Sequence, residues 1–254
     1  MVRFLKNFIS RLLPNGQVDS IFMKNSIIQQ LPNPQPQFGM HITLMGLRDR
    51  GYVPDVVFDI GAADGSWTRQ ALQIWPDSRY ICFEPLTERR AALAALVADQ
   101  PDHVVFQPFG VGNTDCELSL GVTDFLWDSS FAYSGSSARN VAVYKLDSLF
   151  VQGLIPRPSF VKIDVQGFER RVIDGGENVL SGTDFVLMEC SFFAFCDEMC
   201  TLDQTIAFMS EHGFIPYEFV DFLRRPLDGA MGQCDILFVR SGHPLVSDRR
   251  WIAV

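Results

Sequence analysis

Two acidic residues frame a short turn that contains glycine. Asp59 and Asp64 enclose the run Gly61-Ala62-Ala63, and Gly65 closes the turn. Carboxylates repel a pyrophosphate but attract a cation, and S-adenosylmethionine carries both a sulfonium and an α-amino group. Glu84 follows Gly65 by 19 residues, close to the interval of about 20 at which a carboxylate binds a ribose diol in dinucleotide folds. These residues predict a nucleoside-cofactor site, and the two acids favour S-adenosylmethionine over a dinucleotide.

A second polar stretch lies about 80 residues further on, in an apolar run that begins at Phe160. Lys162, Asp164 and Gln166 alternate there with apolar residues, so a strand would place all three side chains on one face. Asp164 would then lie near the carboxyl end of the strand, where open α/β sheets bind their ligands. Burying such a trio is costly unless its members are paired, which favours a functional role, although a purely structural Lys162–Asp164 pair is an alternative.

The predicted cofactor, S-adenosylmethionine, is a methyl donor. Were the acceptor an alcohol, its oxygen would have to be aligned with the methyl carbon and its proton removed. We expect Asp164 to act as the base or to orient the hydroxyl, Lys162 to tune its charge, and Glu189 to be a neighbouring catalytic candidate. His212 is the runner-up base, although a lone histidine at a helix end is more often structural. Four aromatic residues are candidates for the wall of an apolar acceptor pocket: Trp127, Phe192, Phe193 and Phe195.

The order of apolar runs and turns predicts an α/β fold that positions these residues. Val56 to Ile60 reads as a buried parallel strand, and a helix ending near Pro76 leads to a second strand from Tyr80 to Phe83. Further strands are expected at 103–109, from Phe160, and at 185–190, 214–220 and 235–240, with helices at 40–50, 88–98, 169–180 and 202–212. This count indicates a seven-stranded doubly wound sheet with helices on both faces.

An insert at 124–140 lies between two expected exposed strands, 117–122 and 141–146. We interpret it as a lid or substrate-facing loop, with an ordinary surface loop as the alternative. Thr87 is a plausible N-cap for the helix that follows Glu84.

The N-terminal region, residues 1–37, is distinct from the domain predicted at 38–254. Met1 to Leu13 forms a basic amphipathic pattern, too short for the ~20 apolar residues of a membrane span and without a signal cleavage site. Pro32, Pro34 and Pro36 then mark an arm that cannot be helical. We expect Met1 to Leu13 to form a short amphipathic helix that packs on its own domain or on a homodimer partner, with weak contact to an anionic membrane surface as the alternative.

Composition narrows the function. The net charge of −9 disfavours nucleic acid as a partner, because phosphate binding needs a basic face. The six cysteines lie mostly in apolar runs, which is typical of a reducing compartment and predicts a cytoplasmic protein. Cys196 and Cys200 have no second Cys/His pair at ligand spacing, so no metal site is predicted.

Five stretches together resemble the FkbM-type S-adenosylmethionine-dependent methyltransferases over roughly residues 55–240. They are VVFDIGAADGSWT from Val56, FEPL from Phe83, LDSL from Leu146, VKIDVQGFE from Val161 and LMEC from Leu187. The resemblance implies a Rossmann-like class I methyltransferase fold and, in most members, O-methylation of hydroxyls on natural products or sugars.

Matched position by position, the resemblance assigns Asp59, Gly61, Gly65 and Glu84 to the cofactor loop and ribose, and Asp164 to the acid of the KID motif. With these the predicted cofactor-binding residues are Asp59, Gly61, Ala62, Asp64, Gly65, Glu84 and Pro85. The family usually has an acid where this chain has Gln166, which weakens the case for a carboxylate cluster or bound metal. It also usually has Asn where Ala63 or Asp64 stands.

Three function classes follow. An O-methyltransferase acting on a small-molecule hydroxyl is the leading one. An NAD(P)-linked oxidoreductase is the second, opposed by the absence of the G-x-G-x-x-G pattern in the turn. A non-catalytic partner subunit that retains the fold is the third, because a fold does not by itself determine a function.

Overall fold

A computed structural model describes residues 39–123, 126, 129–131, 137–196 and 199–248 of the 254-residue chain. The predicted N-terminal helix and proline-rich arm lie outside these residues, so they and the domain boundary at residue 38 stay predictions. Among the described residues, none of the helices has the length and apolar character needed to cross a membrane.

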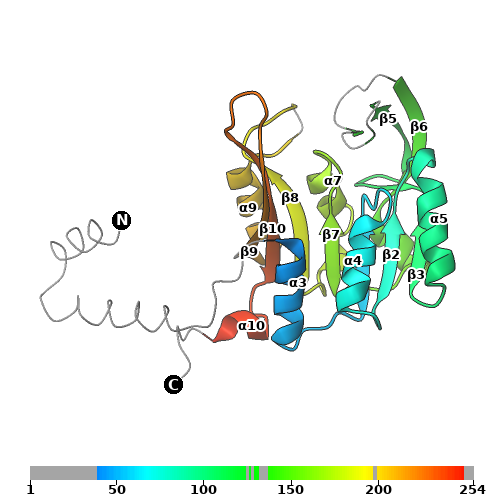
Figure 1. The fold of residues 1–254 in the computed structure, drawn as a ribbon. Coiled ribbons are helices and arrows are strands. Elements are labelled where there is room, and N and C mark those ends of the chain that lie inside the picture. The colour runs from blue at the N-terminus through cyan, green and yellow to red at the C-terminus, as the bar shows by residue number, and fades with distance from the viewer. Residues whose placement is uncertain (1–38, 124–125, 127–128, 132–136, 197–198, 249–254) are drawn as a thin grey trace, which may run out of the picture. The chain divides into compact units, whose positions relative to one another are not determined.

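The main sheet has seven strands in the order β3-β2-β1-β7-β8-β10-β9 (Figure 1). Strands β3, β2, β1, β7 and β8 are parallel neighbours, whereas β10 runs antiparallel to both β8 and β9. This order confirms the predicted Rossmann-like class I methyltransferase fold. The strands are β1 (Val56–Ile60), β2 (Arg79–Phe83), β3 (Val104–Gln107), β7 (Phe160–Ile163), β8 (Phe185–Ser191), β9 (Phe214–Arg224) and β10 (Met231–Arg240).

Helices cover both faces of this sheet, which explains why its central strands read as continuous apolar runs. On one face the core contains residues of three helices, α3 (Met40–Asp49), α4 (Ser66–Ile74) and α5 (Arg90–Asp99). On the other face it contains residues of α6 (Leu146–Val151), α7 (Glu169–Asp174), α8 (Glu177–Leu180) and α9 (Leu202–Glu211). The predicted doubly wound arrangement is therefore confirmed.

A smaller sheet of three strands has the order β4-β6-β5. Its strands are β4 (Gly110–Val111), β5 (Cys116–Val122) and β6 (Ser137–Tyr144), and β5 pairs antiparallel with β6. Figure 1 shows β5 and β6 at the same end of the domain as α7, which follows the carboxyl end of β7. The second flanking strand was expected at 141–146, but it starts earlier and is followed at once by α6, a helix that the sequence did not predict.

Two predicted helices differ from the structure. The helix expected at 169–180 is divided into α7 and α8 at Gly175 and Gly176. Gly175 packs so closely on the chain that a Cβ there would lie 1.9 Å from the carbonyl oxygen of Gly112. The helix expected from Glu88 begins at Arg90, after a 3₁₀ turn η1 (Thr87–Arg89). Thr87 is therefore not the N-cap of α5. The described chain ends with a short helix α10 (Pro244–Ser247).

Candidate active site

A cavity of about 330 Å³ lies at the carboxyl ends of β1, β2 and β7 and is also lined by residues of β8 and β10. In open α/β sheets this edge, where the strand order reverses between β1 and β7, is the expected ligand site. The volume falls within the ~300–1,000 Å³ of typical ligand pockets. Seven of the predicted site residues line it: Gly61, Ala62, Glu84, Pro85, Lys162, Asp164 and Glu189.

The turn after β1 presses the ends of two strands together. The backbone N–H groups of Gly61 and Ala62 both donate to the carbonyl of Phe83, at 3.0 and 3.1 Å, which ties the turn to the end of β2. Gly61 has φ +77°, and a Cβ there would lie 1.9 Å from the carbonyl oxygen of Asp164. Only glycine therefore allows the end of β1 to approach the end of β7 this closely.

Asp64 and Gly65 stabilise the turn but do not line the cavity. Asp64 Oδ1 accepts a hydrogen bond from the backbone N–H of Ser66 at 3.1 Å, and this bond contributes to lowering the pKa of Asp64 against the opposing effect of partial burial. Gly65 has φ +77°, and a Cβ there would meet Leu96 Cδ2 at 2.8 Å, so it allows the start of α4 to pack on α5. Their predicted contact with a cofactor stays a prediction.

Glu84 is held in a fixed orientation at the carboxyl end of β2. Its carboxyl group is buried, with the residue 5% exposed, and it accepts hydrogen bonds from the backbone N–H groups of Ala63 at 2.9 Å and Leu86 at 2.8 Å. Burial raises its pKa to about 7 despite these two bonds. Each carboxylate oxygen has about two acceptor positions, so Glu84 retains capacity for a ligand diol.

Lys162 joins the ends of β1 and β7. Its Nζ lies 3.2 Å from Asp59 Oδ1 and 3.4 Å from Asp164 Oδ2, and it donates to the carbonyl of Gly61 at 3.0 Å. Asp59 is fully buried and also accepts a 2.6 Å hydrogen bond from Thr68, so it lies beneath the turn and not on the cavity wall. Burial alone would lower the pKa of Lys162, but attraction by Asp59 and Asp164 raises it above its usual value. The structural pairing of Lys162 thus exists, with Asp59 as its buried partner.

Three carboxyl groups form one side of the cavity, which we call the acidic wall: Asp164, Glu189 and Asp235. Gln166 Nε2 donates to Asp164 Oδ1 at 2.8 Å and reaches Glu189 Oε2 at 3.3 Å. Strand β7 ends at Ile163, so the alternation predicted for Lys162, Asp164 and Gln166 stops there. The side chains meet in a loop instead, in which Gln166 has the positive φ of 55°.

Two members of the acidic wall, Glu189 and Asp235, hold their protons more strongly than isolated carboxyl groups do. The pKa of Glu189 is raised to about 9, first by burial and then by repulsion from Asp164, Glu169 and Asp235. The pKa of Asp235, which lies opposite Glu189 in the β8–β10 pairing, is raised to about 6 by burial and then by Asp164. At neutral pH Glu189 is therefore a protonated, uncharged group that can donate a hydrogen bond.

Sequence reasoning missed two acidic residues of this region. Glu169 Oε1 accepts hydrogen bonds from the backbone N–H groups of Val165 at 3.2 Å and Gly167 at 3.0 Å, which fixes the loop that carries Gln166. Burial raises the pKa of Glu169 to about 7. An acid in the first turn of a predicted helix, two residues after Gly167, was the available signal for it. For Asp235 the signal was a carboxylate in an otherwise apolar strand.

The insert contributes part of the wall opposite the strand ends. Of its described residues, Leu126, Ser129, Ser130 and Phe131 line the cavity. Ser130 Oγ donates to the carbonyl of Gln166 at 2.6 Å, and the Phe131 ring lies 4.9 Å from that of Phe168. These contacts support the substrate-facing interpretation over an ordinary surface loop.

The predicted aromatic wall is not seen among the described residues. Trp127 lies outside them. Phe192 packs against the core, whereas Phe193 and Phe195 are exposed, and none of these three phenylalanines lines the cavity.

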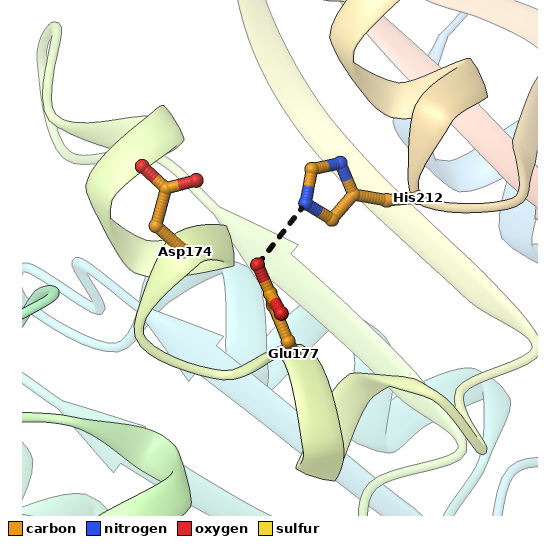
Figure 2. A group of neighbouring side chains, drawn as sticks. All are labelled: Asp174, Glu177 and His212. Atoms are coloured by element: carbon orange, nitrogen blue, oxygen red, sulfur yellow. Dashed lines mark ion pairs between the residues drawn. The ribbon is translucent and has the colours of Figure 1, made fainter.

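His212 lies at the end of α9, away from the cavity, so the structure does not support it as the runner-up base. Its Nδ1 is 2.8 Å from the carbonyl of Phe208, and its Nε2 is 3.8 Å from Glu177 Oε1 (Figure 2). Asp174, Glu177 and His212 have potential metal-ligand atoms that all lie within 4.8 Å of one another. Among the described residues this is the one such group of three or more Asp, Glu, His or Cys side chains. The Glu177 side chain is 66% exposed, and exposed groups of this kind are common without an ion.

Comparison with known proteins finds two methyltransferases that are similar to this chain. The chain is 24% identical to the hexuronic acid methyltransferase AglP of Haloferax volcanii, over 53% of this chain and 55% of AglP. It is also 24% identical to the 2-O-methyltransferase NoeI of Sinorhizobium fredii, over 72% of this chain and 82% of NoeI.

Among solved structures, the methyltransferase FkbM of Methylobacillus flagellatus aligns with a TM-score of 0.46 and 16% identity, over 72% of this chain and 43% of that one. The chain thus spans less than two thirds of AglP and of the Methylobacillus protein. The model of the methyltransferase FkbM domain matches residues 59–216, which is more than half of the sequence and includes every predicted catalytic and cofactor residue. The chain belongs to the FkbM methyltransferase family.

Proposed function

We propose that this chain is an S-adenosylmethionine-dependent O-methyltransferase that acts on a hydroxyl group of a small molecule. The observation that carries the proposal is the position of Glu84: two backbone N–H groups hold its carboxyl at the carboxyl end of β2, on the wall of the cavity. This is where a ribose diol needs an acceptor. Membership of the FkbM family supports the same activity.

The residues of the cavity fit this cofactor better than a dinucleotide. Glu84, Asp164 and Asp235 line the cavity and would repel a pyrophosphate but attract a sulfonium and an ammonium, whereas the protonated Glu189 adds no charge of its own. Gly61, Ala62 and Pro85 supply the adjoining backbone. S-adenosylmethionine would supply the electrophilic methyl group. The acids and the family match therefore favour a methyltransferase over an NAD(P)-linked oxidoreductase.

Within the acidic wall, Asp164 is our candidate for the group that accepts or orients the acceptor proton. Its side chain is 39% exposed, so a ligand can reach it, and the Lys162 ammonium lies 3.4 Å from its Oδ2. Glu189 carries a proton at neutral pH and can orient the acceptor by donating a hydrogen bond to it. Lys162 itself holds Asp59, Asp164 and the Gly61 carbonyl and thereby positions the other groups.

AglP is named for methylation of a hexuronic acid and NoeI for methylation at a 2-O position. By this analogy we propose that the acceptor of the present chain is a sugar or another polyhydroxylated compound. A cytoplasmic location, a homodimer and weak membrane contact through residues 1–13 stay predictions of the sequence.

The cofactor is tested by thermal unfolding with S-adenosylmethionine, S-adenosylhomocysteine and NAD(H). A ligand present at 100 times its Kd stabilises the fold by ~2.7 kcal/mol, which raises Tm by roughly 5–10 °C for a domain of this size. We expect this shift with both adenosyl compounds and none with NAD(H). The reverse pattern would overturn the proposal. Transfer of labelled methyl to a panel of hydroxyl compounds then distinguishes an enzyme from a partner subunit that only binds the cofactor.

A further inference from the structure

The charged side chains that line the cavity are unequal in sign. Among the described residues they comprise the carboxyl groups of Glu84, Asp164, Glu189 and Asp235 and two cationic groups, Lys162 and Arg89. An acceptor that carries its own charge must therefore find a partner in this set. The positions of the two cations therefore determine whether the cavity can bind an anionic or a cationic acceptor.

Lys162 is not available to a new anion, and Arg89 belongs to η1 and not to the part of the chain that carries the acidic wall. The three N–H donors of an ammonium are matched at Lys162 by Asp59, Asp164 and the Gly61 carbonyl, all within 3.4 Å. Arg89 follows Glu84 in η1, and its charge lowers the pKa of both Glu84 and Asp64, so it belongs to the cofactor side of the cavity.

The acidic wall has the opposite character. Between Asp164 and Glu189 lies the uncharged amide of Gln166, which donates to the first at 2.8 Å and reaches the second at 3.3 Å. Asp235 pairs across the sheet with Glu189 and also lines the cavity. No cationic side chain other than Lys162 lines the cavity from β7, β8 or β10 among the described residues. The three carboxyl groups are partly exposed, so a ligand can reach them.

We propose that the acidic wall selects the acceptor by charge: the hydroxyl compound carries no carboxylate or phosphate beside its reacting hydroxyl, and an amine at that place strengthens its binding. The proposal rests on the proposed function and makes it more specific. It also separates this chain from AglP, whose name specifies a hexuronic acid and which it matches over only 55% of AglP.

The physical reason is repulsion at short range in a partly desolvated site. A carboxylate placed beside Asp164 and Asp235 would face like charges, and Lys162, the cation on this side of the cavity, already contacts Asp59, Asp164 and the Gly61 carbonyl. An ammonium would gain up to three carboxylate partners instead. Because the ammonium favours the ionised form of Glu189, binding of an amine should also release a proton from that group.

The first experiment measures the charge preference without requiring turnover. The full chain is saturated with S-adenosylhomocysteine at pH 7.5 and titrated with three matched hydroxyl compounds: 2-aminoethanol, ethane-1,2-diol and hydroxyacetate. We expect 2-aminoethanol to bind at least tenfold more tightly than hydroxyacetate, with the diol between them. Equal affinities, or tighter binding of hydroxyacetate, overturn the inference.

Two variants locate the preference. Asp235→Asn and Glu189→Gln should each reduce the ratio of amine to carboxylate affinity at least threefold, whereas Asp174→Asn, which removes a carboxylate outside the cavity, should leave it unchanged. Far-UV circular dichroism verifies that each variant is folded. If the wall variants keep the full ratio, the charge preference does not come from the acidic wall and the inference fails.

Turnover separates this inference from the proposed function. Labelled methyl transfer is compared for a methyl hexoside, its 2-amino-2-deoxy analogue and the corresponding hexuronide. A higher kcat/KM for the hexuronide contradicts the charge inference and leaves the methyltransferase proposal standing. Failure to bind S-adenosylhomocysteine contradicts the proposed function. In that case the three small compounds are titrated into the protein without S-adenosylhomocysteine, and their relative affinities still support or overturn the charge preference.

Discussion

Glu84 and Asp164 illustrate how two carboxyl groups in one cavity are suited to different tasks. Glu84 is almost fully buried and is oriented by two backbone N–H groups, so it offers a fixed acceptor. Asp164 is 39% exposed and contacts two polar side chains, Lys162 and Gln166. A fixed acceptor suits recognition of a rigid diol, whereas a partly exposed carboxylate beside an ammonium suits proton transfer.

Replacing Glu84 by Gln tests its role in cofactor binding. A hydrogen bond to a charged group contributes ~1.5–3 kcal/mol, so Glu84→Gln should weaken S-adenosylhomocysteine binding by roughly 10- to 150-fold. Calorimetric titration measures this, and far-UV circular dichroism verifies the fold. Glu88→Gln is the control, because Glu88 pairs with Arg139 at the surface and does not line the cavity. Unchanged affinity in a folded Glu84 variant would show that Glu84 does not bind the ribose.

Replacing Asp164 by Asn separates catalysis from stability. Lys162 keeps its buried partner Asp59 in this variant, so we expect the free energy of unfolding to change by less than ~1 kcal/mol. Loss of a positioned acid–base group should lower kcat by about 10²–10⁴ while cofactor affinity stays nearly constant.

The measurements are kcat, cofactor Kd and urea unfolding on one preparation, with Asp174→Asn as the control outside the cavity. A folded Asp164→Asn enzyme with full activity would remove Asp164 from the mechanism and leave Glu189 as the next candidate. A large loss of stability would instead indicate that Asp164 is mainly structural.

At the scale of elements, the strands were predictable because their apolar runs are bounded by glycine, proline and polar residues. The interruptions of expected helices were not predictable, because they depend on contacts between residues that are distant in the sequence. Gly175, the C-cap of α7, packs against the carbonyl of Gly112, and nothing near Gly175 in the sequence predicts that contact.

The candidate site shows the same division. The sequence placed Asp164, Gln166 and Glu189 in one site, because each follows or ends an expected strand at the same edge of the sheet. Strand alternation was the expected reason for their proximity. In the structure their proximity results from the positive φ of Gln166 and from the two backbone hydrogen bonds that Glu169 accepts. A loop conformation of this kind depends on tertiary contacts, so residue types alone do not determine it.

The junction of β1 and β7 gives a prediction with a matched control. Gly61 and Gly153 have similar φ values, +77° and +70°, but a Cβ at Gly61 would lie 1.9 Å from the Asp164 carbonyl oxygen and one at Gly153 would meet nothing within 4 Å. Gly153→Ala should therefore cost only the ~1–2 kcal/mol of a left-handed alanine. Gly61→Ala should cost clearly more, because the two strand ends must separate.

Urea unfolding of the two variants measures the difference, and cofactor affinity should fall in Gly61→Ala but not in Gly153→Ala. Equal destabilisation by the two substitutions would show that the strand ends can move apart easily. The close approach at Gly61 would then not be what shapes the cavity.

For the whole molecule, the concentration of acids at one edge of the sheet makes stability depend on pH. Burial is the largest cause of the raised pKa values of Glu84 and Glu169, both about 7, of Asp235, about 6, and of Glu189, about 9. In the unfolded chain these groups titrate near their ordinary values of 4.5 for Glu and 3.8 for Asp. At pH values between the ordinary pKa of each group and its raised pKa in the folded protein, the folded state binds more protons than the unfolded state.

The free energy of unfolding should therefore fall as pH rises from about 5.5 to 8.5, because stability decreases with pH wherever the folded state holds the extra protons. Surface carboxyls with lowered pKa values, such as Glu88 and Asp228 at about 2, act in the opposite direction but only at acid pH. Urea unfolding at intervals across this range measures the slope. Glu189→Gln should reduce it, because the amide does not titrate, whereas Glu88→Gln should leave it unchanged. Stability that is constant or rises with pH in this range would mean that the cavity carboxyls ionise as freely in the folded protein as in the unfolded chain, and would remove the basis for a protonated Glu189 at the site.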